Sequence, residues 1–198
     1  TVSENFDAES NVVKDSNAVK TVNKWVAKKT ENKIDGIISD NEFEGLVVNT
    51  VYFNGIFENE FNKEKTKKDW FTGNGIKYER DFMEQTEFLQ YAKTDDAEIV
   101  KLPYVCDNAQ ISMYVLMGND RVTNPTSYIE NTQLSETYVN LKMPKFNFEY
   151  ETSVIPHLEN MGIMDINLNK MTTIPLSAFD VIQKTYISTD ENGTEASA

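Results

Sequence analysis

Residues 46–57 are the segment that most restricts how this chain can fold. Val, Tyr and Phe dominate the stretch, and apolar side chains occupy both alternating sets of positions. Because successive side chains of a strand point to opposite faces, this pattern predicts a strand that is covered on both faces. Asn49 is the polar exception. It is either a hydrogen-bonding node inside the sheet or a sign that the strand is wrongly placed.

The rest of the chain predicts an α+β fold, with mostly antiparallel strands and a few helices packed on one side. Valines at helical spacing predict an amphipathic helix over residues 16–29, capped by Asp15 or Ser16. A loop with a short helix is expected over 118–137, and another short helix over 152–161. Strands are predicted over 78–83, 88–92, 99–103, 111–117 and 176–189.

The segment from Val139 to Tyr150 contains a change of phase. Val139, Leu141 and Met143 share one set of alternating positions, whereas the aromatic residues after Pro144 occupy the other set. A phase change at a proline predicts a bend or bulge where the chain leaves one sheet surface for another.

Composition excludes several classes of function. The 198 residues include 19 Lys and Arg and 32 Asp and Glu, and the net charge of −13 argues against nucleic-acid binding. A single cysteine argues against a disulfide framework, and a single histidine argues against a His-ligated metal centre. The sequence contains no phosphate-binding loop, so no nucleotide cofactor is expected. No apolar window reaches the roughly 18 to 20 residues that span a bilayer. Without a linker or a repeat, residues 1–198 are expected to form a single domain.

Catalytic groups are scarce. His157 lies in a predicted helix among apolar neighbours, where a lone histidine is more often a surface or packed residue than a base. Cys106 could act as a nucleophile only with that same histidine as its base. We therefore expect Cys106 to be a small buried side chain at the end of a strand. The sequence therefore gives no support for an enzyme.

The last residues have an unusual pattern. An acidic turn, Asp190 to Gly193, is followed by small residues up to Ala198. If this segment were extended, Thr194, Ala196 and Ala198 would share one face that could be buried, and Glu195 and Ser197 would share a face suited to water. The segment could join a sheet as a strand, although composition alone favours a flexible tail.

At this point the sequence resembles the serpins, and the similarity runs in order along nearly the whole chain. Each motif is weak alone, but together they form a specific collinear pattern. The matching segments are Asn23-Lys24-Trp25-Val26, residues 48–55 with Phe61, Thr66 and Phe71, Phe82-Met83, Val100-Lys101-Leu102-Pro103-Tyr104, Ile111-Ser112-Met113, Met143-Pro144-Lys145-Phe146, residues 158–162 and residues 190–198.

The resemblance implies a serpin-like fold: a large mixed, mostly antiparallel central sheet with smaller sheets and helices around it. It also implies a larger domain, in which helices precede Thr1 and the scissile bond follows Ala198. The implied function is a suicide substrate that traps a protease as an acyl complex while its reactive-centre loop inserts into the main sheet. The alternative is a non-inhibitory binding, storage or carrier serpin. An extracellular setting is expected, although the family also occurs inside cells.

The resemblance also assigns roles to particular positions. The hinge of the reactive-centre loop falls on Glu191, Asn192, Gly193, Thr194, Glu195, Ala196, Ser197 and Ala198. Lys145 and Glu191 correspond to an ion pair where the sheet opens. Asn49 corresponds to a polar node whose usual histidine partner is Gln183 here, and Phe57 replaces a usual tryptophan. Asn192 begins a glycosylation sequon. A glycan there would hinder entry of the hinge, so we expect either that the sequon is unused or that the protein is intracellular.

The implied partner is a protease of the serine type, with the cysteine type left open. A glycosaminoglycan is a second candidate partner, because Lys63, Lys65, Lys67 and Lys68 are close together. Glu64 and Asp69 interrupt this run, which favours an ordinary solvated loop.

Overall fold

The computed structural model describes residues 13, 15–40, 45–46, 48–73, 75–107, 109–118, 122–163 and 179–198. The chain divides into two compact units. The first comprises Thr1–Phe53, Phe148–Ile187 and Ala196–Ala198, and the second comprises Asn54–Asn147 and Ser188–Glu195. Among the described residues, no helix combines the length and the apolar character needed to cross a membrane.

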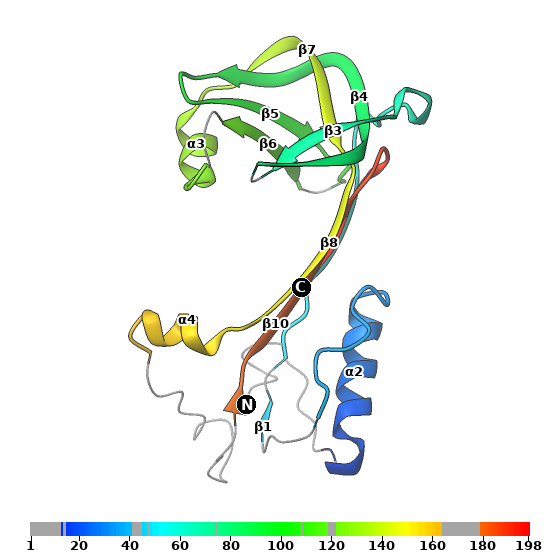
Figure 1. The fold of residues 1–198 in the computed structure, drawn as a ribbon, viewed down its shortest axis with the longest axis vertical. Helices are drawn as coiled ribbons and strands as arrows, with labels where there is room; N and C mark the ends of the chain where they lie inside the picture. The colour runs from blue at the N-terminus through cyan, green and yellow to red at the C-terminus, as the bar shows by residue number, and fades with distance from the viewer. Residues whose placement is uncertain are drawn as a thin grey trace. The chain divides into compact units, whose positions relative to one another are not determined.

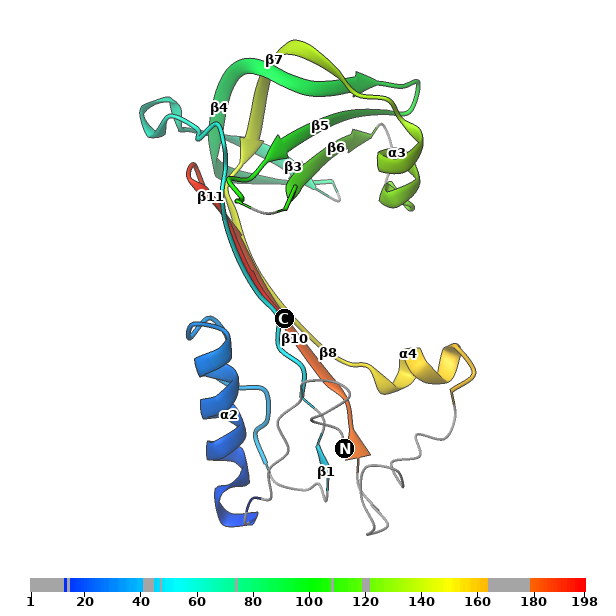
Figure 2. The same cartoon turned by 180° about the vertical axis from the view of Figure 1, so that it is seen from behind.

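A four-stranded sheet contains the end of the chain. Its strand order is β2 (Tyr52–Ile56), β11 (Gly193–Ser197), β10 (Ile182–Thr189) and β8 (Phe146–Ser153). The small residues at the end of the sequence therefore form an interior strand, between β2 and β10, and not a flexible tail (Figure 2).

The predicted strand over residues 46–57 is shorter than expected. Regular pairing in β2 begins only at Tyr52, and a separate strand β1 (Gly45–Leu46) pairs in parallel with β9 (Phe179–Asp180). The prediction that this strand is covered on both faces is also wrong for the described residues. Gly55 and Phe57 on one face are buried, whereas Ile56 on the other face is 54% exposed.

A five-stranded antiparallel sheet belongs to the second unit (Figure 1). Its strands are β3 (Lys67–Gly73), β4 (Ile76–Lys93), β5 (Ala97–Pro103), β6 (Ser112–Gly118) and β7 (Ser135–Pro144).

The two strands predicted over 78–83 and 88–92 form the single strand β4. The polar residues between them do not end the strand, because β7 pairs with β4 continuously from Phe82 to Tyr91. The core of this unit includes Met83, Ile99, Leu102 and Met143.

Helices and turns complete the described structure. The helix α2 (Ala18–Lys29) follows a 3-10 turn, η1 (Asp15–Asn17), and buries Val26. The predicted cap is wrong, because the cap residue is Asn17 and its side chain makes no capping hydrogen bond. Further short helices are η2 (Lys63–Lys65), α3 (Pro125–Asn131) and α4 (Ile155–Asn160).

The predicted bend after Pro144 is present between β7 and β8. Lys145 lies between these strands, and its backbone N–H donates to the carbonyl oxygen of Asp81 over 2.8 Å. The backbone leaves one sheet and enters another at this residue, which explains why the apolar pattern changes phase.

Candidate functional site at the turn between β10 and β11

Backbone hydrogen bonds hold β11 against β2 in an antiparallel register. Val51 and Ala198 exchange two N–H···O bonds of 2.5 and 2.8 Å, and Phe57 donates to the carbonyl of Asn192 over 2.9 Å. The residue numbers in both pairs have the same sum, as an unbroken antiparallel register requires. Pairing on both sides also removes an exposed sheet edge.

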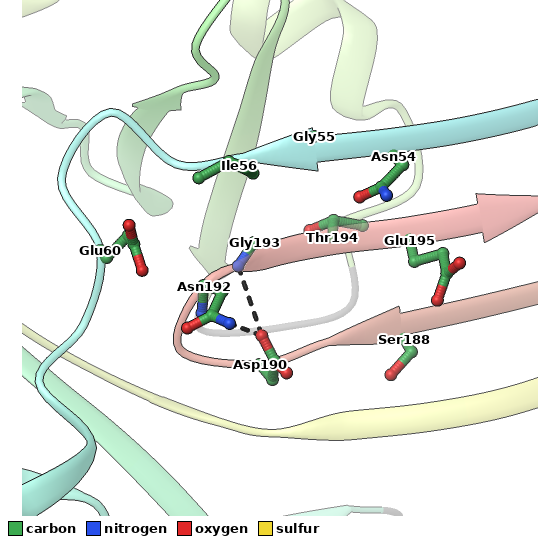
Figure 3. Close-up of a pocket in the computed structure, with 10 residues that line it drawn as sticks. All are labelled: Asn54, Gly55, Ile56, Glu60, Ser188, Asp190, Asn192, Gly193, Thr194 and Glu195. Carbon is green, nitrogen blue, oxygen red and sulfur yellow. Dashed lines mark hydrogen bonds between the residues drawn. The ribbon is translucent and has the colours of Figure 1, made fainter.

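The turn that leads into β11 is built around Asp190. Its Oδ1 atom accepts hydrogen bonds from the backbone N–H groups of Asn192, over 2.9 Å, and Gly193, over 3.4 Å (Figure 3). The backbone N–H of Asp190 also donates to the carbonyl of Gly193. This local bonding is typical of aspartate in turns and fixes the direction in which the chain reverses.

Gly193 approaches β2 closely. A Cβ atom at this position would lie 1.9 Å from the carbonyl oxygen of Gly55 and 3.0 Å from the Cα of Ile56. No larger residue fits without movement of the backbone, so glycine is required here by space.

Glu191 is the central charged group of the turn, and its side chain is only 4% exposed. Lys145 Nζ donates to Oε2 over 2.8 Å, and Thr66 Oγ1 donates to Oε1 over 2.6 Å. Burial raises the pKa of Glu191, but the hydrogen bonds from Lys145 and Thr66 outweigh burial and hold the pKa at about 2. The carboxylate therefore stays charged across the physiological pH range.

Thr194 enters a buried cluster of hydroxyl groups. Its Oγ1 lies 3.0 Å from Oγ1 of Thr189, and its hydroxyl also hydrogen-bonds to Tyr104. The Tyr104 ring stacks on Phe57 with the ring centroids 5.1 Å apart, and Phe61 meets Phe57 edge to face. Phe57, placed where the family usually has tryptophan, therefore supports the cluster by packing alone.

A pocket of about 430 Å³ lies beside the turn (Figure 3). Its lining includes Asn54 and Glu60 with the first residues of β11. The carboxylates of Glu60, Asp190 and Glu195 give the pocket an acidic character.

The expected division of β11 into a buried and a wet face is only partly present. Thr194 is buried, but Ala196 and Ala198 are half-buried. Ser197, expected to face water, is 4% exposed, and its hydroxyl has no hydrogen-bond partner among the described residues. The prediction failed because burial along β11 does not alternate: Thr194 and Ser197 are buried, and the residues between them are half-buried.

The structure does not bring Asn49 and Gln183 into a polar node. Both side chains are exposed, and no hydrogen bond joins these two described residues. Asn49 precedes β2, in residues without regular structure, so the interpretation of Asn49 as a buried node is wrong.

Cys106 is also exposed, contrary to the expectation of a small buried side chain, because it follows the end of β5 and the bridge at Tyr104. His157 lies exposed on α4.

The sequence interpretation did not assign site roles to Thr66, Tyr104 and Thr189. The available signal was weak: each is a hydroxyl-bearing residue beside an apolar or charged stretch, and a buried hydroxyl needs a partner. Only the folded structure shows that these partners are Glu191 and Thr194.

The comparison with protein families decides the identity of the fold. The family model described as "Serpin (serine protease inhibitor)" matches residues 1–198. The chain belongs to the serpin family. This confirms the resemblance and the predicted fold class.

Several serpins from distant organisms are similar to this chain. An uncharacterized serpin-like protein of Methanosarcina mazei is 29% identical over 196 residues, which cover 90% of this chain and 46% of that protein. Serpin B4 of Homo sapiens is 30% identical over 203 residues, covering 90% of this chain and 52% of the relative. The chain thus spans about half the length of the curated serpins it matches.

Solved serpin structures share the fold. "Cleaved Serpin 42Da" has a TM-score of 0.82 and 25% identity, and covers 99% of this chain and 59% of that one. The structure of the thermophilic serpin tengpin in the latent state has a TM-score of 0.75 and 26% identity, and the match covers 99% of this chain and 59% of tengpin.

Proposed function

We propose that this serpin is a protease inhibitor that acts as a suicide substrate. The observation that carries the proposal is the position of β11, whose hinge residues Gly193–Ser197 form an interior strand between β2 and β10. A segment that pairs on both sides gains a full set of strand hydrogen bonds when it enters the sheet. This gain is a source of the free energy needed to trap a protease.

In the proposed reaction, the nucleophilic Oγ of a serine protease attacks the carbonyl carbon of a scissile bond in the segment that serpins place after the hinge. The peptide C–N bond breaks, and the leaving amine takes a proton from the protease's own general acid. The resulting ester joins protease and inhibitor. Insertion of the hinge then competes with attack by water on this ester. The protease is trapped when insertion wins, whereas hydrolysis releases active protease and a cleaved, spent inhibitor.

The proposal treats residues 1–198 as the central and hinge portions of a single larger serpin domain. It also favours the inhibitory class over a binding, storage or carrier serpin. The supporting residues are Gly193 and Thr194, which enter the sheet first and present no bulky or charged side chain. A charge at Thr194 would carry a desolvation cost into a buried position.

The test is a reaction of the full-length protein with a panel of serine and cysteine endopeptidases. We expect at least one serine protease to form a complex that resists SDS, and Thr194→Arg to be cleaved by the same protease without forming it. A protease that cleaves the wild-type loop but leaves no complex would contradict inhibition and favour the carrier alternative.

Four exposed lysines form the candidate surface for a glycosaminoglycan: Lys63 and Lys65 on η2, and Lys67 and Lys68 on β3. Lys68 already pairs with Glu79 over 3.2 Å, and Glu64 lies within the run. We therefore expect weak retention on immobilised heparin, with elution below roughly 0.15 M salt. If the wild type stays bound above this salt concentration and the double variant Lys63→Ala/Lys65→Ala does not, the lysines form a stronger glycosaminoglycan site than we expect.

The proposal places the protein outside the cell and leaves the glycosylation sequon at Asn192 unused. Asn192 is exposed, but its backbone N–H donates to Asp190 within the turn and its carbonyl accepts from the backbone N–H of Phe57. We expect mass spectrometry of the secreted protein to find Asn192 unmodified. A glycan at full occupancy on an active inhibitor would contradict this expectation.

A further inference from the structure

Three hydroxyl groups meet at the point where β11 begins. Thr189 closes β10 and is 1% exposed, Thr194 is 6% exposed, and Tyr104 is 5% exposed. The Thr189 and Thr194 oxygens are 3.0 Å apart, and the Thr194 hydroxyl also bonds to Tyr104. The Thr194 side chain therefore has a partner on each side, one from β10 and one from the residue that follows β5.

We propose that Thr189 and Tyr104 are positioning residues that form a latch, recognising the hydroxyl of Thr194 when β11 occupies the sheet. Backbone pairing cannot supply this recognition, because it accepts any residue except proline. A small side chain at position 194 would satisfy the steric requirement but leave the Thr189 hydroxyl buried without Thr194 as its partner. The latch therefore selects a hydroxyl as well as a small residue.

The latch acts in one state only. When residue 194 is outside the sheet, the contact between Thr189 and Thr194 does not exist, and removal of either hydroxyl should leave that state unchanged. Once residue 194 is inside the sheet, loss of the Thr194 hydroxyl leaves a buried group unpaired, which carries the full desolvation penalty of that group. The effect of the latch on trapping rests on the proposed function. Its effect on stability rests only on entry of the loop into the sheet after cleavage, which a rise in the unfolding midpoint of the wild type on cleavage measures.

The first test measures the inserted state directly. The full-length protein is cut in its loop by a broad-specificity protease, and the unfolding midpoint in guanidinium chloride is measured before and after cleavage. We expect Thr194→Val to lower the midpoint of the cut form by on the order of 0.3 M and to leave the uncut form unchanged. Thr194→Ser keeps the hydroxyl and should restore the wild-type midpoint.

Thr189→Val and Tyr104→Phe should each lower the unfolding midpoint of the cut form and leave that of the uncut form unchanged. Each shift should be smaller than that of Thr194→Val, because Thr194 keeps its other partner. Thr185→Val is the matched control on the same strand, since Thr185 donates to the backbone oxygen of Tyr150 and not to β11. Tyr91→Phe is the matched control for Tyr104→Phe, because the Tyr91 hydroxyl donates to Glu98 and not to β11. Equal losses in the cut and uncut forms, or a Thr194→Val shift no larger than that of Thr185→Val, would overturn the latch.

The second test measures trapping. With a protease that the wild type traps, Thr194→Val should raise the number of inhibitor molecules consumed per protease at least about threefold, and Thr194→Ser should not. If the wild type traps nothing, the proposed function fails while the first test still decides the latch. If the wild type traps and Thr194→Val traps equally well, the latch has no part in trapping and this half of the proposal is wrong.

Discussion

The two ends of β11 are held in different ways. At its beginning, Glu191 and Thr194 form side-chain hydrogen bonds to four residues of the second unit: Lys145, Thr66, Thr189 and Tyr104. At its end, Ala198 is bound to Val51 through backbone groups, and the buried Ser197 hydroxyl has no partner among the described residues. Recognition that depends on side chains is thus concentrated where the strand starts.

This difference has a physical reason. A strand that enters a sheet from its turn must first place residues 191–194 correctly, because each later residue follows the register that they set. Side-chain contacts at the start fix that register, and backbone pairing then extends it with little dependence on sequence. Changes near the turn should therefore have large effects, and changes near Ala198 small ones.

The largest effect is expected for Gly193→Ala. The added methyl group would lie 1.9 Å from the Gly55 carbonyl oxygen, so the backbone must move, at a cost of about 3 kcal/mol or more in the inserted state. We expect most of the gain in unfolding stability after loop cleavage to be lost. Gly73→Ala is the control, since its new methyl group would meet only the movable ring of Phe71 at 3.2 Å. A cleaved Gly193→Ala protein as stable as the wild type would contradict this account of the turn.

Glu191→Gln should give the next largest effect. A pKa of about 2, against an ordinary 4.5, corresponds to at most about 3 kcal/mol, and because Lys145 is 35% exposed, solvent screening reduces this to about 2 kcal/mol. The lowered pKa means that this stability is present above about pH 4.5 and is lost as the pH falls toward 2.

Guanidinium unfolding of the cleaved form at pH 7, 5 and 3 measures this contribution. The difference between wild type and Glu191→Gln should be full at pH 7 and shrink at pH 3. Asp69→Asn, which breaks the exposed pair with Lys142, should change the stability at pH 7 much less than Glu191→Gln does, because solvent screens an exposed pair. A difference that does not depend on pH would rule out the charged pair as the cause.

Thr66→Val tests the second partner of Glu191 and should cost about 1 kcal/mol. The variant keeps the ion pair with Lys145, so the loss should be smaller than that of Glu191→Gln. It should also raise the pH at which stability is lost, because a hydrogen bond to the charged form is gone. Thr72→Val, on the exposed surface of β3, is the control. If Thr66→Val loses stability at the same pH as the wild type, Thr66 does not stabilise the charged carboxylate of Glu191.

Ser197→Ala should have the smallest effect and the opposite sign. Removal of a buried hydroxyl without a partner relieves a desolvation cost, so the cleaved form should be unchanged or more stable by up to about 1 kcal/mol. The unfolding midpoint of the cleaved variant measures this. A loss of more than 1 kcal/mol would show that the end of β11 is also recognised through its side chains, and the contrast between the two ends would disappear.

Part of this site could be predicted from the sequence because local chemistry dictates it. The turn at residues 190–193 follows from an aspartate, an asparagine and a glycine in succession, and the bend at Pro144 follows from a change of phase. Asn49 and Cys106 were placed wrongly because the pattern gives the polarity of a position but not where a strand begins or ends.

The sequence by itself determined that the last residues are small, acidic at the turn and able to extend, and that the collinear motifs are those of a serpin. The tertiary structure decided that these residues form an interior strand, and that Tyr104, Thr189 and Thr66 are their partners. Contacts such as that between Thr66 and Glu191 join residues 125 positions apart. Local propensity carries no information over such a separation, and only the packed sheet brings these groups within hydrogen-bonding distance.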